Sequence, residues 1–324
     1  MNLWRHFDGP HARPFVVLGA CIFMLAAVDG DRGRFFSAAT TYSILQTFAT
    51  ISLVTLGLGL TMMIREFDLS VVGMYGMAGC IAVLVGTQHP WLGLWCALAL
   101  GLTAGIVQGF IIVRLHLSSV GVTLGGLLVF VGVAFVLTES RSLPYDNLGV
   151  ALLLNERISD IFSIRSVVAV VFFVSAAAIF AWTRLGRDII AIGSDRRAAV
   201  TAGVKVDMLI IGIFAFSGLC AALSGVLLSY SLASASPAGL SDVIAPAAAG
   251  AILGGVSLGG GSGRPLGIAA GALTLAVLRS GLNAVGAPPF VNDIAMGAVL
   301  VTVAVLDGPY LARRLISMRR ALGA

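Results

Sequence analysis

The chain has 324 residues and a net charge of +5, and 58% of its residues are hydrophobic whereas only 11% are charged. Soluble globular proteins carry roughly 25% charged residues, so this composition excludes an ordinary soluble domain and indicates that most of the exterior faces a lipid bilayer. The basic residues lie at the ends of apolar segments, which is typical of membrane-protein loops and argues against a nucleic-acid partner.

Apolar segments follow one another along the chain, and a helix needs about 20 residues to cross the hydrocarbon core. No small-residue cleavage site follows the first segment, so we predict an uncleaved helix there rather than a signal peptide. Glycine-rich stretches such as 247–272 favour half-helices or re-entrant turns. We therefore predict a single domain, 1–324, that is an all-α polytopic membrane protein of about ten transmembrane helices with Gly-rich broken helices. The predicted spans are residues 14–28, 42–64, 69–86, 91–113, 120–138, 166–182, 208–231, 243–256, 265–278 and 293–306.

Two polar loops interrupt this series, at residues 139–165 and 183–207. Lys and Arg residues concentrate on the cytoplasmic side of membrane proteins. Fourteen of the 20 Lys and Arg residues fall on the side that holds both termini and the loop 183–207, and six fall on the other side. This bias predicts cytoplasmic termini, a cytoplasmic loop 183–207 and a periplasmic loop 139–165.

The loop 183–207 is too charged to span a membrane, yet Ile189, Ile190 and Ile192 keep a helical spacing. Ser194 or Asp195 can cap a short helix that runs to Gly203, where the glycine ends it. A short helix between spans suits the docking of a partner protein. A merely solvated loop is the alternative.

Asp68 lies where a turn enters a span. A carboxylate at membrane depth costs several kcal/mol unless it is paired or hydrated. We predict that Asp68 caps the helix that starts at Ser70, with its charge near the positive end of the helix dipole. Direct contact with a substrate and ion coupling are the alternatives.

No grouping in the sequence indicates catalysis. The glycine run at residues 259–263 continues into Arg264 and Pro265, whereas a phosphate-binding Walker loop requires Lys followed by Ser or Thr. We therefore predict that the chain does not hydrolyse ATP. We also predict neither a metal site nor a catalytic residue, because histidines and cysteines occur singly and far apart. These are His6, His11, His89, His116, Cys21, Cys80, Cys96 and Cys220.

A solute pathway requires polar and aromatic side chains that face a cavity between spans. Five residues are candidates, although each could equally be a packing residue or an interhelical hydrogen bond. They are Gln46, Phe48, Thr50, Phe130 and Asn283.

The segment 183–204 contains a spaced pattern of small, apolar and basic residues: Thr183, Gly186, Arg187, Ile189, Ala191, Ile192, Gly193, Ala198, Ala199 and Gly203. In this pattern the segment resembles the cytoplasmic coupling region of ribose-type sugar permeases, which belong to the branched-chain amino acid/ribose permease family of bacterial ABC importers. In that family a coupling helix sits in a groove of the ATPase subunit and transmits its closure. The resemblance implies that the coupling residues of this chain are Gly186, Arg187, Gly193, Ala198, Ala199 and Gly203.

Three other segments resemble motifs of the same family in the same order, over roughly residues 40–307. The chain departs from these motifs at three places. Arg65-Glu66-Phe67 replaces Gly-Gly-Ile, Ser119-Val120-Gly121 replaces Pro-Phe-Ile, and Ser241-Asp242-Val243 stands where a Glu-Leu pair is usual. These departures bear on the transported solute more than on the type of transporter. The motif residues carried over are Asp68, Ser70, Gly73, Thr123, Gly125, Gly254 and Gly255.

The resemblance implies a permease of an ATP-driven importer in the bacterial inner (plasma) membrane, which translocates a small neutral sugar by alternating access. It implies three protein partners: a cytoplasmic ABC ATPase that carries ATP and Mg, a periplasmic solute-binding protein, and a second permease copy in a homo- or heterodimer. The chain itself would hold no cofactor. The alternatives are an importer of nucleosides or amino acids of the same family, an ion-coupled secondary transporter and a membrane-embedded enzyme.

Overall fold

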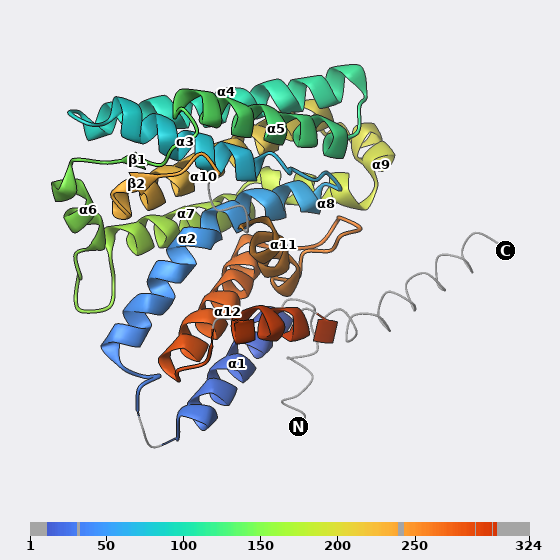
Figure 1. Cartoon of the computed structure of the whole chain (residues 1–324). Helices are drawn as coiled ribbons and strands as arrows, with labels where there is room; N and C mark the ends of the chain where they lie inside the picture. Colours follow the sequence, from blue (N-terminus) through green and yellow to red (C-terminus); the bar gives the residue numbers. More distant parts are fainter. Residues whose placement is uncertain (1–11, 31–32, 239–242, 289, 300, 303–324) are drawn as a thin grey trace, which may run out of the picture.

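Helices make up nearly all of the regular structure (Figure 1). The computed structural model describes residues 12–30, 33–238, 243–288, 290–299 and 301–302; Arg5, His6, His11, Ser241 and Asp242 lie outside them. A two-residue strand β1 (Leu143–Pro144) pairs antiparallel with β2 (Ser234–Ala235). The helices are α1 (Arg13–Asp29), α2 (Ala38–Met63), α3 (Val71–Val85), α4 (Pro90–Leu115), α5 (Ser119–Leu137), α6 (Leu148–Asn155), α7 (Ile164–Trp182), α8 (Arg184–Ser194), α9 (Arg196–Thr201), α10 (Val206–Ser231), α11 (Ile244–Leu253), α12 (Pro265–Ala284) and the unlabelled Phe290–Val299.

The predicted apolar segments within the described residues form helices. Among the described residues, six helices are long and apolar enough to cross a bilayer, namely α2, α4, α5, α7, α10 and α12. Shorter apolar helices, α1, α3, α11 and Phe290–Val299, occupy the other predicted spans, of which 293–306 continues beyond the described residues. The prediction of an all-α membrane protein is thus confirmed.

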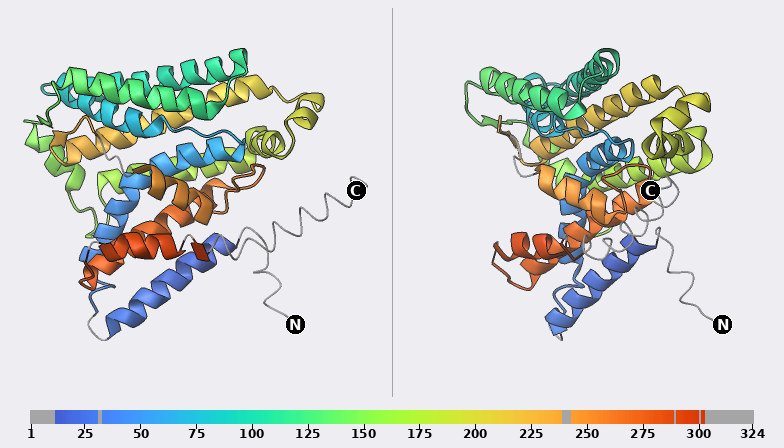
Figure 2. Two further views of the ribbon diagram at one scale, coloured as in Figure 1. Left: turned by 45° about the vertical axis from the view of Figure 1, so that its right-hand side comes forward. Right: turned by 90° about the vertical axis from the view of Figure 1, so that its right-hand side faces the viewer.

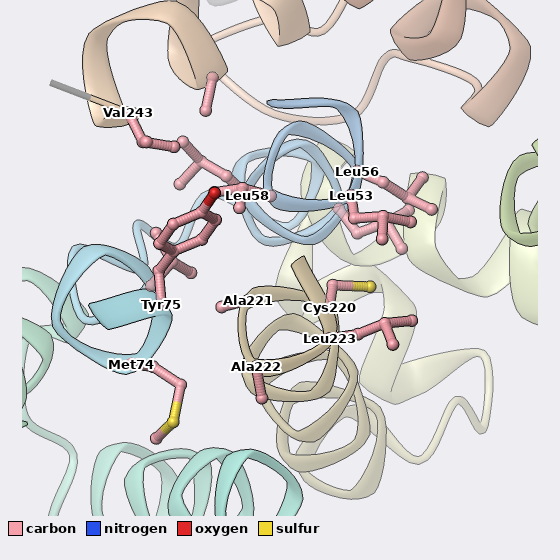
Figure 3. Packing of buried hydrophobic residues seen from close by; sticks show 14 of the residues in the cluster. Leu53, Leu56, Leu58, Met74, Tyr75, Cys220, Ala221, Ala222, Leu223 and Val243 are labelled. Atoms are coloured by element: carbon pink, nitrogen blue, oxygen red, sulfur yellow. The ribbon is translucent and has the colours of Figure 1, made fainter. Parts of the chain in front are cut away.

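The core lies around α10, which packs against α2, α3 and α4. Most residues of α2, α10 and α12 are buried inside the protein, whereas few residues of α5 and α7 are. Figure 3 shows Ala221 and Ala222 of α10 between this helix and its neighbours, where larger side chains would keep the helices apart. This distribution of apolar side chains, inside and outside alike, is expected of a protein whose solvent is lipid.

Small residues at every fourth position of α4 form its contact with α10. A Cβ at Gly101 would lie 2.5 Å from the carbonyl oxygen of Gly218, and one at Gly105 would overlap the carbonyl oxygen of Phe214. The two main chains are therefore in direct contact, as in small-residue helix pairs of membrane proteins. The buried small residues of this stripe are Gly93, Ala97, Gly101, Gly105 and Gly109.

Within 247–272, a glycine-rich connection separates α11, which ends at Leu253, from α12, which begins at Pro265. Gly255 has φ +82°, and its N–H and that of Val256 bond to the carbonyls of Ile252 and Ala251 at 2.9 and 3.1 Å, which closes the last turn of α11. Gly254 permits the crossing of α12, because a Cβ there would lie 2.6 Å from the Cα of Ile268.

The two polar loops lie at opposite ends of the helix bundle (Figures 1 and 2). The loop 139–165 carries β1 and the short helix α6 at one end, whereas the loop 183–207 forms α8 and α9 at the other. Opposite faces are what the predicted topology requires.

Candidate functional site

The α8–α9 end carries the first candidate site, and local caps explain why two short helices form there. The Asp195 side chain accepts hydrogen bonds from the N–H groups of Arg197 (2.9 Å) and Ala198 (3.1 Å), so Asp195 is the N-cap of α9. The Ala198 and Arg197 N–H groups hold the pKa of this carboxyl below its ordinary value. Gly203, at φ +82°, ends the helix, and its N–H bonds to the carbonyl of Val200 at 3.0 Å.

The predicted capped helix that ends at Gly203 is therefore confirmed, with Asp195 as the cap. The additional helix α8 precedes it, and its N-cap is Thr183, whose hydroxyl accepts from the Leu185 N–H at 3.2 Å. The prediction of a single short helix missed this second one.

The six residues assigned to coupling divide into two groups by exposure. Gly186, Gly193 and Ala199 are buried and face the membrane helices, whereas Arg187, Ala198 and Gly203 are exposed. Only the exposed group is available to a partner. The buried group positions α8 and α9.

Gly193 holds α8 against two other segments through main-chain contacts. A Cβ at Gly193 would overlap the carbonyl oxygen of Met63, at the end of α2, and the N of Gly261. The Gly261 N–H in turn donates to the same Met63 oxygen at 2.9 Å. The glycine run after α11 thus joins α2 and α8 at one junction, and Gly260 and Gly261 have positive φ values of 70° and 72°.

The second candidate site is the turn between α2 and α3, where Asp68 is only 1% exposed. One carboxylate oxygen accepts from the N–H (3.0 Å) and the hydroxyl (2.6 Å) of Ser70, and the other accepts from the hydroxyl of Ser217 on α10 (2.7 Å). These donors offset the cost of burying the carboxylate. The N-cap position of α3 is Ser70 itself, so Asp68 bonds to the capping residue and not to the first turn, which corrects the predicted cap.

Residues of α5 fix the same turn from the other side. The Phe67 and Leu69 N–H groups donate to the hydroxyls of Ser119 and Thr123, both at 3.1 Å. Two motifs that are about 50 residues apart in the sequence therefore form one structural unit.

Two motif glycines of this region differ in their surroundings. A Cβ at Gly73 would lie 2.7 Å from the carbonyl oxygen of Leu127, so this glycine permits the contact of α3 with α5. Nothing lies within 4 Å of a Cβ at Gly125. Close packing therefore requires a glycine at position 73 but not at 125.

The five pathway candidates do not form one site. Gln46 and Thr50 lie together on α2. Phe48 packs against Phe173 in the core, with ring centroids 5.7 Å apart, and Phe130 lies against Gly73 of α3. Asn283, on α12, accepts a hydrogen bond from Asn292 at 3.1 Å.

A residue that the sequence analysis missed lies beside Thr50. Arg165 was counted as a loop charge, but it is the second residue of α7 and its side chain is 5% exposed. Its guanidinium donates to the hydroxyls of Thr50 (2.8 Å) and Ser231 (3.0 Å), and its Nε has no partner within the described part of the chain. The sequence did contain a signal for this burial, namely an arginine at the edge of an apolar segment. Charged side chains inside membrane proteins are costly and usually face the interior of the helix bundle.

No three His, Cys, Asp or Glu side chains lie close enough to hold a metal ion in the described ranges.

The comparisons with known proteins agree with one another. Residues 40–304 match a family described as branched-chain amino acid transport system / permease component. The chain is 30% identical over 298 residues to the ribose import permease protein RbsC of Escherichia coli K12, which covers 89% of this chain and 91% of the relative. It is 29% identical over 315 residues to the fructose import permease protein FrcC of Rhizobium meliloti (94% of this chain and 87% of the relative). No solved structure matches the chain.

A third relative is the autoinducer 2 import system permease protein LsrC of Photorhabdus luminescens. It is 30% identical over 296 residues, which cover 89% of this chain and 87% of the relative.

Proposed function

The chain belongs to the family of branched-chain amino acid transport system permease components, and on this premise we propose that it is the membrane-spanning permease of an ATP-driven bacterial importer for a small neutral sugar. The observation that carries the proposal is the α8–α9 pair, a short helical element that packs with one buried face on one end of the helix bundle and exposes charged residues on the other. The relatives named for ribose and fructose support a sugar. The family description makes an amino acid the second candidate.

In this proposal ATP and Mg bind to a separate ATPase chain, which docks on the exposed surface of α8 and α9. Arg187, Ala198 and Gly203 lie on that surface, and the buried Gly193 transfers displacement of α8 to the end of α2. The permease chain itself holds no cofactor and performs no catalysis. An ion-coupled transporter would have no use for such a docking element.

The proposed topology has ten spans within one domain, 1–324, in the inner membrane. In this topology the shorter helices α1, α3, α11 and the helix beginning at Phe290 would add four spans to the six long helices. The excess of Lys and Arg supports cytoplasmic termini and a cytoplasmic α8–α9 end. A periplasmic solute-binding protein would then deliver the sugar at the α6 end, and a second permease copy would complete the pathway by alternating access.

The test uses the whole chain in proteoliposomes with its candidate ATPase and solute-binding protein. We expect the ATPase to co-purify with the permease, and ATP supplied on the ATPase side to drive uptake of radiolabelled D-ribose or D-fructose. Ala198→Trp, on the exposed side of α9, should abolish co-purification. The matched control Leu152→Trp, on an exposed position of α6 at the opposite end, should not.

Two results would contradict the proposal. One is uptake that follows an imposed ion gradient without the ATPase. The other is ATP-driven uptake of L-leucine but of neither sugar, which would favour the amino acid importer.

A further inference from the structure

Two charged residues that follow α2, Arg65 and Glu66, contact both sides of the break between α8 and α9. The Arg65 guanidinium donates to the carbonyl oxygen of Ser194, the last residue of α8, at 2.8 Å. The Arg196 guanidinium, from the first residue of α9, donates to the carboxylate of Glu66 at 3.1 Å. Asp195 lies between these two contacts, so the pair spans the break.

The backbone at Arg65 shows that the turn itself does not need this side chain. Arg65 has φ 64°, a left-handed conformation that glycine adopts freely and other residues rarely do. The N–H groups of Arg65 and Glu66 bond to the carbonyls of Met62 and Thr61 at 3.0 and 3.1 Å, which is the usual closure of a helix by glycine. The backbone of an arginine is strained in this conformation, and the side-chain hydrogen bond to Ser194 offsets that cost.

These two electrostatic contacts contribute more to the orientation of α9 than to the stability of the fold. A cation at the carbonyl end of α8 interacts favourably with the helix dipole. Glu66 is 12% exposed and Arg196 is 48% exposed, and ion pairs with an exposed partner contribute little to stability. The main effect of the Glu66–Arg196 ion pair is therefore to fix the position of α9.

The same turn continues directly into the buried Asp68 network. Its next residues bond to Ser119 and Thr123 of α5, and Asp68 bonds to Ser217 of α10. One short turn, residues 65–69, thus joins α8 and α9 on one side to α5 and α10 on the other. Packed and hydrogen-bonded contacts of this kind can carry coupling between two parts of a protein, and double-mutant cycles test whether they do.

We propose that Arg65 and Glu66 form a two-point clamp that makes the turn 65–69 follow the α8–α9 pair. Both side chains are then positioning residues for coupling ATP hydrolysis to sugar movement. The clamp rests on the proposed function, because a partner ATPase must move α8 and α9.

The first test measures D-ribose imported per ATP hydrolysed in proteoliposomes that contain the permease, its ATPase and its binding protein. Glu66→Gln and Arg196→Gln should each lower this ratio by about fivefold or more, the lower limit of typical coupling effects, with ATPase co-purification and melting temperature unchanged. The charge-reversed double variant Glu66→Arg with Arg196→Glu should recover most of the loss. Arg114→Gln, at an exposed arginine in the last turn of α4 and outside α8 and α9, is the matched control and should behave like wild type.

The second test needs no substrate. Spin labels at Val120 on α5 and Val200 on α9 report whether the two segments move together, in a Cys96→Ser background because Cys96 is the exposed cysteine within the described residues. In the wild-type complex with ATPase we expect one narrow distance distribution with and without ATP. Glu66→Gln should broaden it when ATP is added, and the charge-reversed pair should narrow it again.

Single variants that couple as well as wild type, or a charge-reversed pair as poor as the single variants, would overturn the clamp alone. A wild-type chain that recruits no ATPase would overturn the proposed function and the clamp with it.

Discussion

Replacement of Gly193 by alanine is the sharpest perturbation that the structure offers. The added Cβ would overlap two main-chain atoms, the Met63 oxygen and the Gly261 nitrogen, and would lie 3.0 Å from the Gly261 Cα. Main-chain atoms cannot rotate away as a side chain can, so α8 must shift and the 2.9 Å bond between Gly261 and Met63 must weaken. Overpacking of this kind costs roughly 1–3 kcal/mol. At about 2–4 °C per kcal/mol, we expect the melting temperature to fall by about 5 °C.

The assay is thermal unfolding of the detergent-solubilised chain. Each variant is heated at the same rate, and the folded protein that remains is measured by size-exclusion chromatography. Gly125→Ala is the matched control, because it makes the same chemical change in a helix where nothing lies within 4 Å of the new Cβ. Removing a helix glycine there should stabilise slightly, by roughly 0.5–1 kcal/mol. Equal melting temperatures for Gly193→Ala and wild type, or an equal fall in both variants, would refute the reasoning.

Three further predictions use the same melting assay or amide exchange. Ser217→Ala leaves one Asp68 oxygen without its 2.7 Å donor and should cost about 1.5–3 kcal/mol; an unchanged melting temperature would contradict the network. Thr50→Val should destabilise by about 1–3 kcal/mol, because the buried Arg165 loses its 2.8 Å partner, whereas Thr50→Ser should not. The pKa of Asp195 is lowered on folding, so its capping contribution is complete above the unfolded value of about 4 and is lost as the pH falls through the lower folded value. The Arg197 and Ala198 amides donate to this carboxyl. Their protection from hydrogen exchange, measured relative to their intrinsic exchange rates, should therefore decrease only in that acidic range. Asp195→Ala should remove this protection at every pH.

The sequence was sufficient to predict structural features that depend on neighbouring residues alone. The Asp195 cap and the Gly203 stop depend on backbone groups within a few residues. The stop was predicted at Gly203, and the cap was predicted at Ser194 or Asp195. The break that separates α8 from α9 was not. Asp195 caps α9 locally, but the side chains that contact both sides of the break are those of Arg65 and Glu66, which lie about 130 residues away in the chain. No pattern within 183–207 shows those contacts.

The burial of single charged residues and glycines could not be predicted from the sequence either, for a physical reason. Hydropathy locates Arg165 at the edge of an apolar run, but its burial depends on Thr50 and Ser231, which come from two distant helices. Gly73 and Gly125 stand in equally clear motifs, yet only Gly73 lies against another main chain. A motif shows that a residue belongs to a pattern, and only the packing shows what the residue does there.

The glycine run after α11 illustrates how composition and contact together restrict function. Its lack of a following lysine argued against phosphate binding, and its contacts provide another reason for the glycines. Gly260 and Gly261 adopt positive φ values, and Gly261 lies against Gly193 and Met63 main chain to main chain. A main-chain contact has no rotamer through which a displacement can relax, so movement of α8 must move the end of α2 as well. In the proposed importer this junction ties α8 to the end of α2, whereas the clamp of Arg65 and Glu66 ties the break between α8 and α9 to the turn 65–69. We therefore expect Gly193→Ala to impair coupling even at temperatures where the variant remains folded.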